Sequence, residues 1–524
     1  MEQLTGKATM RKIQFRLLRN ACILAVITIC SAGLLAQQPE VPFTLRVKSQ
    51  EVVLDVVVTD RKGNFVNGLT QSDFTVLEDK TKQRITSFQP PSAHSMAADA
   101  PAVNSSADLA KIGNAPVTIL VLDELNTQFT DMAYARGSME KWLNEQPAKL
   151  LQPTVLMVAS DEKFAVLHDY TQNRDELLAA LKKHFPSYPF RMSKGGSIGP
   201  DAGTRMAMSL GTLVQIAQSS TGTPGRKNVI WVGVGFPSLT LDDVSGSKEA
   251  EITTAAANAT LVLLKARVTL NVIDPTAMAS SSLDMNNPEY LTLDALQSVQ
   301  GATDTSVSGI LNFDAFAPAT GGHLFAGKND VDAEIAQAVD NGSNYYTISY
   351  SPSNKEDNPA KFRNISIAMR DPNLVATTRT GYFQERKLQD GEKPPAPTTQ
   401  QLVFDLTSAA LNSLVYNGLA VTAEKSTTGY ILHVGSAALQ PHVLSSGARV
   451  DEVTVMQVSF RKNNVVLGHS ETELKTSFDA DATIPPAVDY TVPVGPLPRD
   501  AVRIRFVVRD AVSGHIGTVD VPVP

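Results

Sequence analysis

The apolar run VTILVLD (117–123) and the ELNT segment that follows it (124–127) decide the fold of this 524-residue chain. A continuous apolar run that ends in an acidic residue is typical of a central parallel strand buried on both faces. Similar runs recur at TVLMVAS (154–160), KNVIWVGVG (227–235) and VTLNVID (268–274), and the segments between them show helical spacing. The alternation predicts a doubly wound, Rossmann-like α/β sheet over 116–342.

The segments on either side of this α/β domain have a different hydrophobic periodicity. Residues 43–90 and 343–383 alternate apolar and polar side chains with period two, which is typical of half-buried strands. Each segment holds too few strands to form a closed core alone. We therefore predict that the α/β domain is inserted in one β-sandwich, whose two parts lie before and after it. The segment 91–115 is rich in Ala, Pro, Ser and Asn and predicts an exposed linker.

The C-terminal quarter of the chain predicts a further domain. Residues 384–401 are charged and rich in proline, as expected of a linker. Residues 402–524 contain mainly short alternating runs with an Asn463-Asn464 turn, which favours a second, Ig-like β-sandwich.

The first 36 residues have the pattern of an export signal. Basic residues between 7 and 19 precede an apolar run at 21–35, and Ala36 is a plausible last residue of a cleaved signal peptide. The alternative is an uncleaved membrane anchor. Both cysteines, Cys22 and Cys30, lie in this segment, so cleavage would leave no cysteine. We expect an exported protein that is periplasmic, at the outer surface or secreted.

The charge balance argues against one class of partner. The chain has 46 Lys+Arg against 53 Asp+Glu and a formal net charge of −7. A nucleic-acid-binding domain normally carries a basic patch and a high isoelectric point. We therefore expect no nucleic-acid partner.

The motifs ILVLDELNT, GRKNVIWVGVGFPS, LNVIDP, ATGGHLF and NYYTISYSP occur in this order along the chain. Together they resemble the von Willebrand factor type A (VWFA, vWA)-related proteins of the acidobacterial type, over about 43–383. The resemblance implies a cell-envelope or secreted protein whose type A domain binds other proteins or surfaces. Such proteins often carry a C-terminal sandwich similar to the one predicted here.

The resemblance also implies a metal site. Type A domains commonly hold Mg²⁺ through an Asp-x-Ser-x-Ser motif after the first strand, a Thr from a later loop and an Asp after a later strand. Mg²⁺ prefers six oxygen ligands in near-octahedral geometry. Here the motif reads Asp123-Glu124-Leu125-Asn126-Thr127, so Asp123 and Thr127 match while Leu125 offers no side-chain oxygen.

The remaining ligands are only partly present. Thr204 is the candidate for the later Thr, and Val234 stands where metal-binding members have Asp. We expect a degenerate metal-ion-dependent adhesion site formed by Asp123, Thr127 and Thr204, with Mg²⁺, Mn²⁺ or Ca²⁺ as the ion. In the alternative interpretation, Asp123 caps backbone amides at the strand end and Thr204 is a helix N-cap.

The leading functional prediction is a non-enzymatic, exported adhesion protein that binds an unknown protein or cell-surface ligand. Its partner-binding surface is framed by an insertion at 275–319. The alternative is a metal-free interaction scaffold of the cell envelope. The residues expected on this surface are Asp123, Glu124, Asn126, Thr127 and Thr204.

A remote alternative is a serine hydrolase that uses Ser197. This serine lies in a Gly-x-Ser-x-Gly pattern at 195–199, which is typical of a nucleophile elbow. An elbow needs a strand before the serine and a helix after it. No apolar run precedes Ser197 and Pro200 follows the pattern, so a loop is favoured and we assign no catalytic residue.

Overall fold

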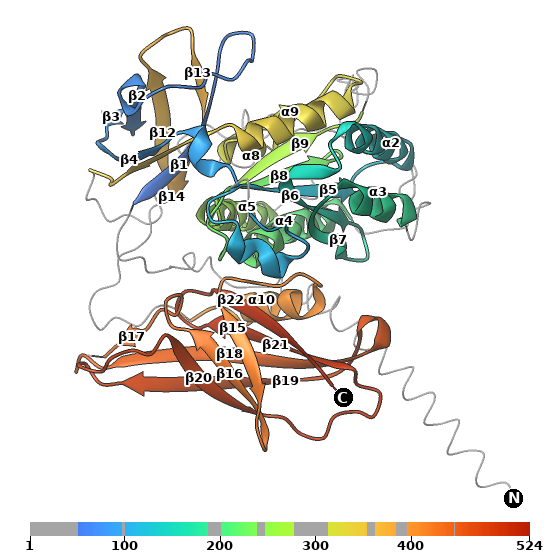
Figure 1. The fold of residues 1–524 in the computed structure, drawn as a ribbon, viewed down its shortest axis with the longest axis vertical. Coiled ribbons are helices and arrows are strands. Elements are labelled where there is room, and N and C mark those ends of the chain that lie inside the picture. Colours follow the sequence, from blue (N-terminus) through green and yellow to red (C-terminus); the bar gives the residue numbers. More distant parts are fainter. Residues whose placement is uncertain are drawn as a thin grey trace, which may run out of the picture. The chain divides into compact units, whose positions relative to one another are not determined.

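The computed structural model describes residues 51–96, 100–186, 201–237, 247–276, 313–353, 362–383, 396–444 and 446–523 (Figure 1). The predicted signal (1–36), Ser197 and most of the predicted insertion lie outside the described residues. The predictions that concern them are unchanged.

A six-stranded mixed sheet forms the centre of the α/β part. Its strand order is β10-β9-β8-β5-β6-β7, and every neighbouring pair is parallel except β6 with β7. The prediction of an α/β sheet is therefore confirmed. The strands are β5 (Val117–Asp123), β6 (Lys149–Ala159), β7 (Phe164–Asn173), β8 (Lys227–Val232), β9 (Val268–Ile273) and β10 (Leu324–Phe325).

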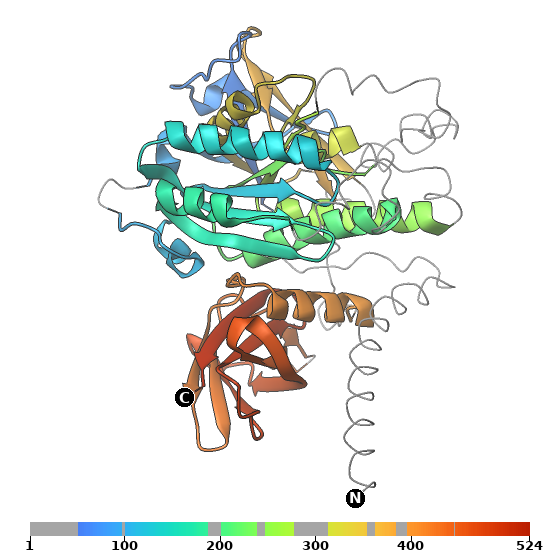
Figure 2. The ribbon, with the colours of Figure 1, turned by 90° about the vertical axis from the view of Figure 1, so that its right-hand side faces the viewer.

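Helices cover both faces of this sheet, as Figure 2 shows for α2 in cyan and α5 in light green. Ile119 and Val121 of β5 pack with α4 and α5, whereas Leu120 and Leu122 pack with α2, α3 and α9. This two-sided burial explains why the strand is apolar throughout. No described helix is long and apolar enough to cross a membrane. The helices are α2 (Phe129–Glu145), α3 (Arg174–Lys183), α4 (Ala202–Ser219), α5 (Ser247–Lys265), α8 (Phe313–Ala319) and α9 (Val331–Ser343).

The strands before the α/β part pair with the strands after it. They form two four-stranded sheets, β13-β1-β11-β4 and β14-β12-β2-β3. Leu54, Val76, Ile348 and Ile365 meet in one buried core. The elements are β1 (Val52–Thr59), η1 (Gln71–Asp73), β2 (Phe74–Glu78), β3 (Thr81–Lys82), β4 (Ile85–Gln89), β11 (Tyr346–Tyr350), β12 (Phe362–Met369), β13 (Val375–Thr377) and β14 (Gly381–Phe383).

The segment 91–115 is not an exposed linker, so that prediction is wrong. It contains two short 3-10 helices, η2 (Pro91–His94) and η3 (Ser106–Lys111). Val103, Leu109 and Ile112 are buried in the core that also holds β5 and α4. A few isolated apolar side chains anchor the segment, and they have no periodicity that the sequence could reveal.

The C-terminal part contains a three-stranded and a five-stranded sheet that share a core. The predicted sandwich (402–524) begins with a helix that the sequence analysis does not predict: α10 (Thr399–Leu411) overlaps the end of the predicted linker and buries Leu406 and Ala409. The other elements are β15 (Val421–Lys425), β16 (Gly429–Gly435), β17 (His442–Val443), β18 (Arg449–Arg461), η5 (Lys462–Asn464), β19 (Val465–Phe478), β20 (Ala487–Pro493), β21 (Arg503–Asp510) and β22 (Ile516–Pro522).

Candidate functional site

The candidate site lies where four parallel strands of the six-stranded sheet end. We call this the carboxyl edge, defined by Asp123 of β5, Ala159 of β6, Val232 of β8 and Ile273 of β9. The chain passes from β5 to β6 on one side and later returns to β8 on the other side. Asp123 therefore lies at the point where the strand order reverses, which is the usual ligand position in such sheets.

The carboxylate of Asp123 is fully buried and accepts hydrogen bonds from the backbone. Oδ1 accepts from the N–H groups of Leu125 (3.2 Å) and Asn126 (2.9 Å), and Oδ2 accepts from Gly235 N–H (3.0 Å). Asp123 thus joins the loop after β5 to the loop after β8. Burial raises the pKa of Asp123 to about 6. The nearby Trp231 indole and the N–H groups of Asn126 and Gly235 stabilise the charged form and offset part of this rise.

Two other residues of the motif join the same loops. Thr127 Oγ1 accepts from Val234 N–H at 3.0 Å. The side-chain amide of Asn126 donates to Ser209 Oγ (2.9 Å) and to the carbonyl oxygen of Gly235 (3.1 Å). The structure therefore brings Asp123, Asn126 and Thr127 together.

Glu124 and Thr204 belong to other contacts. Glu124 Oε1 lies 2.7 Å from His184 Nε2, at the end of α3. Thr204 is exposed, and its N–H and hydroxyl donate to the carboxylate of Asp201 at 2.8 and 3.0 Å. Asp201 is the N-cap of α4, so the alternative that Thr204 caps this helix is wrong. Ser209, further along α4, contacts the motif instead, and no sequence pattern singled it out.

Two glycines in the loop after β8 make this network possible. Gly233 has φ +149° and Gly235 has φ +88°, which L-residues with a side chain rarely adopt. A Cβ at Gly233 would lie 2.4 Å from both Asp123 Cβ and Thr127 Oγ1. The Gly-Val-Gly sequence after a buried strand is a local signal of this close approach.

As arranged here, these residues do not fit a Mg²⁺ ion. Asp123 Oδ1 already accepts two backbone N–H groups, and Asp123 Oδ2 and Thr127 Oγ1 accept one each, so few of their lone pairs remain for an ion. Leu125 and Val234, at two of the expected ligand positions, offer no side-chain oxygen toward the six that Mg²⁺ prefers. Thr204 donates to Asp201 instead of facing the other two residues. Among the described residues, no group of three or more His, Cys, Asp or Glu side chains is suited to a metal.

Two aromatic side chains are exposed beside the carboxyl edge. Phe129 begins α2, soon after the end of β5, and is 44% exposed. Phe185 follows His184, the residue that contacts Glu124, and is 75% exposed. The Arg136 guanidinium lies 5.7 Å from the centre of the Phe185 ring. Large exposed rings next to a cation are common in protein-binding surfaces.

The sequence matches no protein-family model and no curated protein at a significant level. Three solved structures to which the chain is similar are only distantly so. Proximal thread matrix protein 1 from the mussel byssus is 11% identical with a TM-score of 0.24, covering 44% of this chain and 48% of its own. The VWA domain of SpRpn10 is 15% identical with a TM-score of 0.23, covering 42% and 94%. The pilus adhesin SpaC from Lactobacillus rhamnosus GG is 9% identical with a TM-score of 0.28, covering 88% and 59%.

The chain thus spans about half the length of the thread matrix protein and under two thirds of the pilus adhesin. At such low TM-scores these likenesses carry no argument about function.

Proposed function

We propose that this chain is a metal-independent protein-binding module of the von Willebrand factor type A kind, exported and without enzymatic activity. The observation that carries the proposal is the hydrogen bonding of Asp123, whose two oxygens tie the loops after β5 and β8 together. In a metal-dependent module these oxygens would be available to an ion. Here they hold the loops of the carboxyl edge in one shape.

The proposed contact surface is the part of the carboxyl edge around Phe129 and Phe185. Both rings are exposed, and Arg136 adds a cation next to Phe185. A rigid edge below two exposed rings loses little conformational freedom on binding, which favours affinity. We also propose that the α/β part is inserted in a β-sandwich and that the C-terminal sheets form an Ig-like sandwich. The pairing of β1 with β11 and of β2 with β12 supports the first of these.

Calorimetry with Mg²⁺ and Mn²⁺ tests whether a metal takes part. We expect no saturable binding to the full chain and no change in its urea midpoint when EDTA is added. Saturable binding that Asp123→Ala abolishes would contradict the proposal and support the degenerate adhesion site with substitute ligands.

Replacing Asp123 by alanine should destabilise the protein even with EDTA present. The N–H groups of Leu125, Asn126 and Gly235 would lose their acceptor. Each buried donor left without a partner costs about 1–3 kcal/mol. The substitution also removes a carboxylate whose burial is unfavourable, which offsets part of this cost, so we expect a net loss of roughly 2–4 kcal/mol in the free energy of unfolding, measured in urea. Thr204→Ala, which alters an exposed hydroxyl, is the control and should leave the midpoint nearly unchanged.

A photo-crosslinking residue tests the contact surface directly. Placed at Phe185 in cells of the source organism, it should give a specific crosslinked product that EDTA does not remove. The matched control is Leu151, which is 85% exposed but lies near the beginning of β6, away from the carboxyl edge. Equal crosslinking from both positions would contradict a binding surface at this edge.

A further inference from the structure

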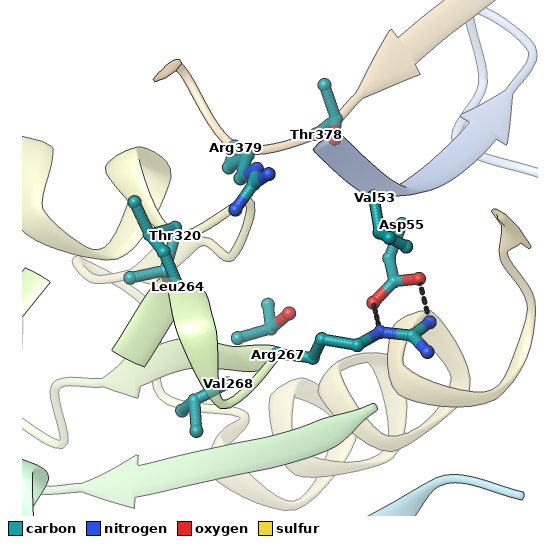
Figure 3. Close-up of a pocket in the computed structure, with 9 residues that line it drawn as sticks. Val53, Asp55, Leu264, Arg267, Val268, Thr320, Thr378 and Arg379 are labelled. Carbon is teal, nitrogen blue, oxygen red and sulfur yellow. Dashed lines mark hydrogen bonds and ion pairs between the residues drawn. The ribbon is translucent and has the colours of Figure 1, made fainter. Parts of the chain in front are cut away.

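A polar pocket lies away from the carboxyl edge, between β1, the start of β9 and the segment before β14 (Figure 3). It is a small, partly open hollow, and the empty space in and around it, open solvent included, is about 290 Å³. Leu264 and Val268 form apolar walls, and Figure 3 shows the Arg379 guanidinium pointing toward the interior. The polar lining residues are Asp55, Arg267, Thr269, Thr320, Thr378 and Arg379.

Positive charge exceeds negative charge around this pocket. Asp55 pairs with Arg267, with Oδ1 at 2.5 Å from Nη2 and Oδ2 at 3.3 Å from Nε. Arg226 lies near this ion pair and is only 1% exposed. Its guanidinium donates to Thr269 Oγ1 and to the carbonyl oxygen of Asn341. One carboxylate thus faces three guanidinium groups, those of Arg226, Arg267 and Arg379. Buried cations are normally balanced by anions.

Two lining side chains have unused hydrogen-bonding groups. The Nε atom of Arg379 and the hydroxyl of Thr378 are buried and have no hydrogen-bond partner among the described residues. Glu78 Oε2 accepts from the hydroxyls of Tyr350 (2.7 Å) and Tyr382 (3.0 Å), and among the described residues no hydrogen bond or ion pair joins Glu78 to Arg379. Burial lowers the pKa of Arg379, as expected for a cation that lacks a close counter-charge.

We propose that this pocket is a binding site for a small oxyanion, held by the Arg379 guanidinium and the Thr378 hydroxyl, with Arg267 beside it. A guanidinium offers two parallel N–H groups that match the spacing of phosphate, sulfate or carboxylate oxygens. Such an anion would supply both the missing negative charge and the missing acceptors. The site is separate from the proposed protein-binding edge and does not depend on it.

Inorganic phosphate tests the site on the full chain. At constant ionic strength, maintained with sodium chloride, phosphate should bind saturably in calorimetry and raise the thermal midpoint by several degrees, since a ligand that binds only the native state stabilises it. Sulfate and acetate in parallel titrations distinguish a tetrahedral anion from a carboxylate. If none of the three stabilises the protein more than chloride does, the proposal is wrong.

Arg379→Gln gives the sharpest contrast. Without phosphate this variant should be at least as stable as the wild type, because it removes a poorly compensated cation; with phosphate the order should reverse. Its phosphate affinity should fall by about tenfold or more, the effect of one lost charged hydrogen bond. A merely structural Arg379 would instead lower stability equally with and without phosphate, and that result would overturn the proposal.

Two further variants complete the test. Arg61→Gln removes an exposed positive charge elsewhere and should leave the phosphate affinity unchanged. Thr378→Val removes the unpartnered hydroxyl and should weaken phosphate binding several-fold with little effect on folding. If Arg379→Gln does not fold, Thr378→Val decides: an unchanged phosphate affinity in that variant would count against the site.

Discussion

Gly233→Ala should lower the free energy of unfolding by about 3 kcal/mol or more. The added Cβ would lie 2.4 Å from Asp123 Cβ and 2.4 Å from Thr127 Oγ1, closer than such atoms approach one another. The backbone at Gly233 also has φ +149°, so alanine is strained there whatever the space. Relief would require β5 and the loop after β8 to move apart, which breaks the hydrogen bonds of Asp123. Urea denaturation followed by circular dichroism measures the effect.

Gly137→Ala is the matched control. Gly137 lies in α2, is exposed, and a Cβ there would meet no atom within 4 Å. Alanine in the middle of a helix should raise stability by about 0.5–1 kcal/mol, because it restricts the unfolded chain. If the two variants have the same stability, Gly233 does not lie as close to Asp123 and Thr127 as the structure places it.

Asp55→Asn should have an effect of similar size, about 3–5 kcal/mol, because it leaves buried guanidinium groups without their carboxylate. Asp55 joins β1 to Arg267, which follows α5, and it also accepts from the hydroxyl of Thr347 on β11 at 3.0 Å. The substitution keeps the size of the side chain and removes the charge. Lys111→Gln, which breaks an exposed ion pair with Asp108, is the control and should barely move the urea midpoint.

The contribution of Asp55 should depend on pH in one direction. Burial alone would raise the pKa of this carboxyl, but the guanidinium groups of Arg267 and Arg226 hold it below its usual value of 3.8. A lowered pKa in the folded state means that the stabilisation is present above pH 3.8 and is lost as the pH falls through the folded-state pKa. The stability difference between wild type and Asp55→Asn should therefore be constant near neutrality and shrink in acid. A difference that grows as the pH falls would contradict this assignment.

The carboxyl edge was only partly predictable. The apolar run that ends at Asp123 revealed a buried strand and an acidic residue at its end, because both properties are local in sequence. The sequence did not reveal that Asp123 would accept the N–H of Gly235, since that contact joins two loops far apart in the chain. Thr204 had a suitable residue type, but the helix turns it toward Asp201 and directs Ser209 to the motif.

The surroundings of Tyr345 also depend on contacts between segments that are distant in the chain. Period-two alternation predicts one core ring and one surface or interface ring for the Tyr345-Tyr346 pair, and both rings are buried. Tyr345 stacks on His94 with ring centres 4.3 Å apart, and the guanidinium of Arg226 lies 5.1 Å from the same ring. His94 comes from the segment predicted as an exposed linker, and Arg226 directly precedes β8. A pattern within one strand carries no information about such partners.

The sequence alone therefore determined the strand-and-helix alternation of the α/β part, the period-two strands on either side of it and the acidic residue at the end of β5. Each of these depends on neighbours within a few residues, where backbone geometry links pattern to structure. The tertiary structure decided which residues share the carboxyl edge and which carboxylate lies among three guanidinium groups. It also decided that Val103, Leu109 and Ile112 are packed in the core. Those outcomes depend on contacts between segments distant in the chain, whose burial and charge become defined only when the sheets and helices pack together.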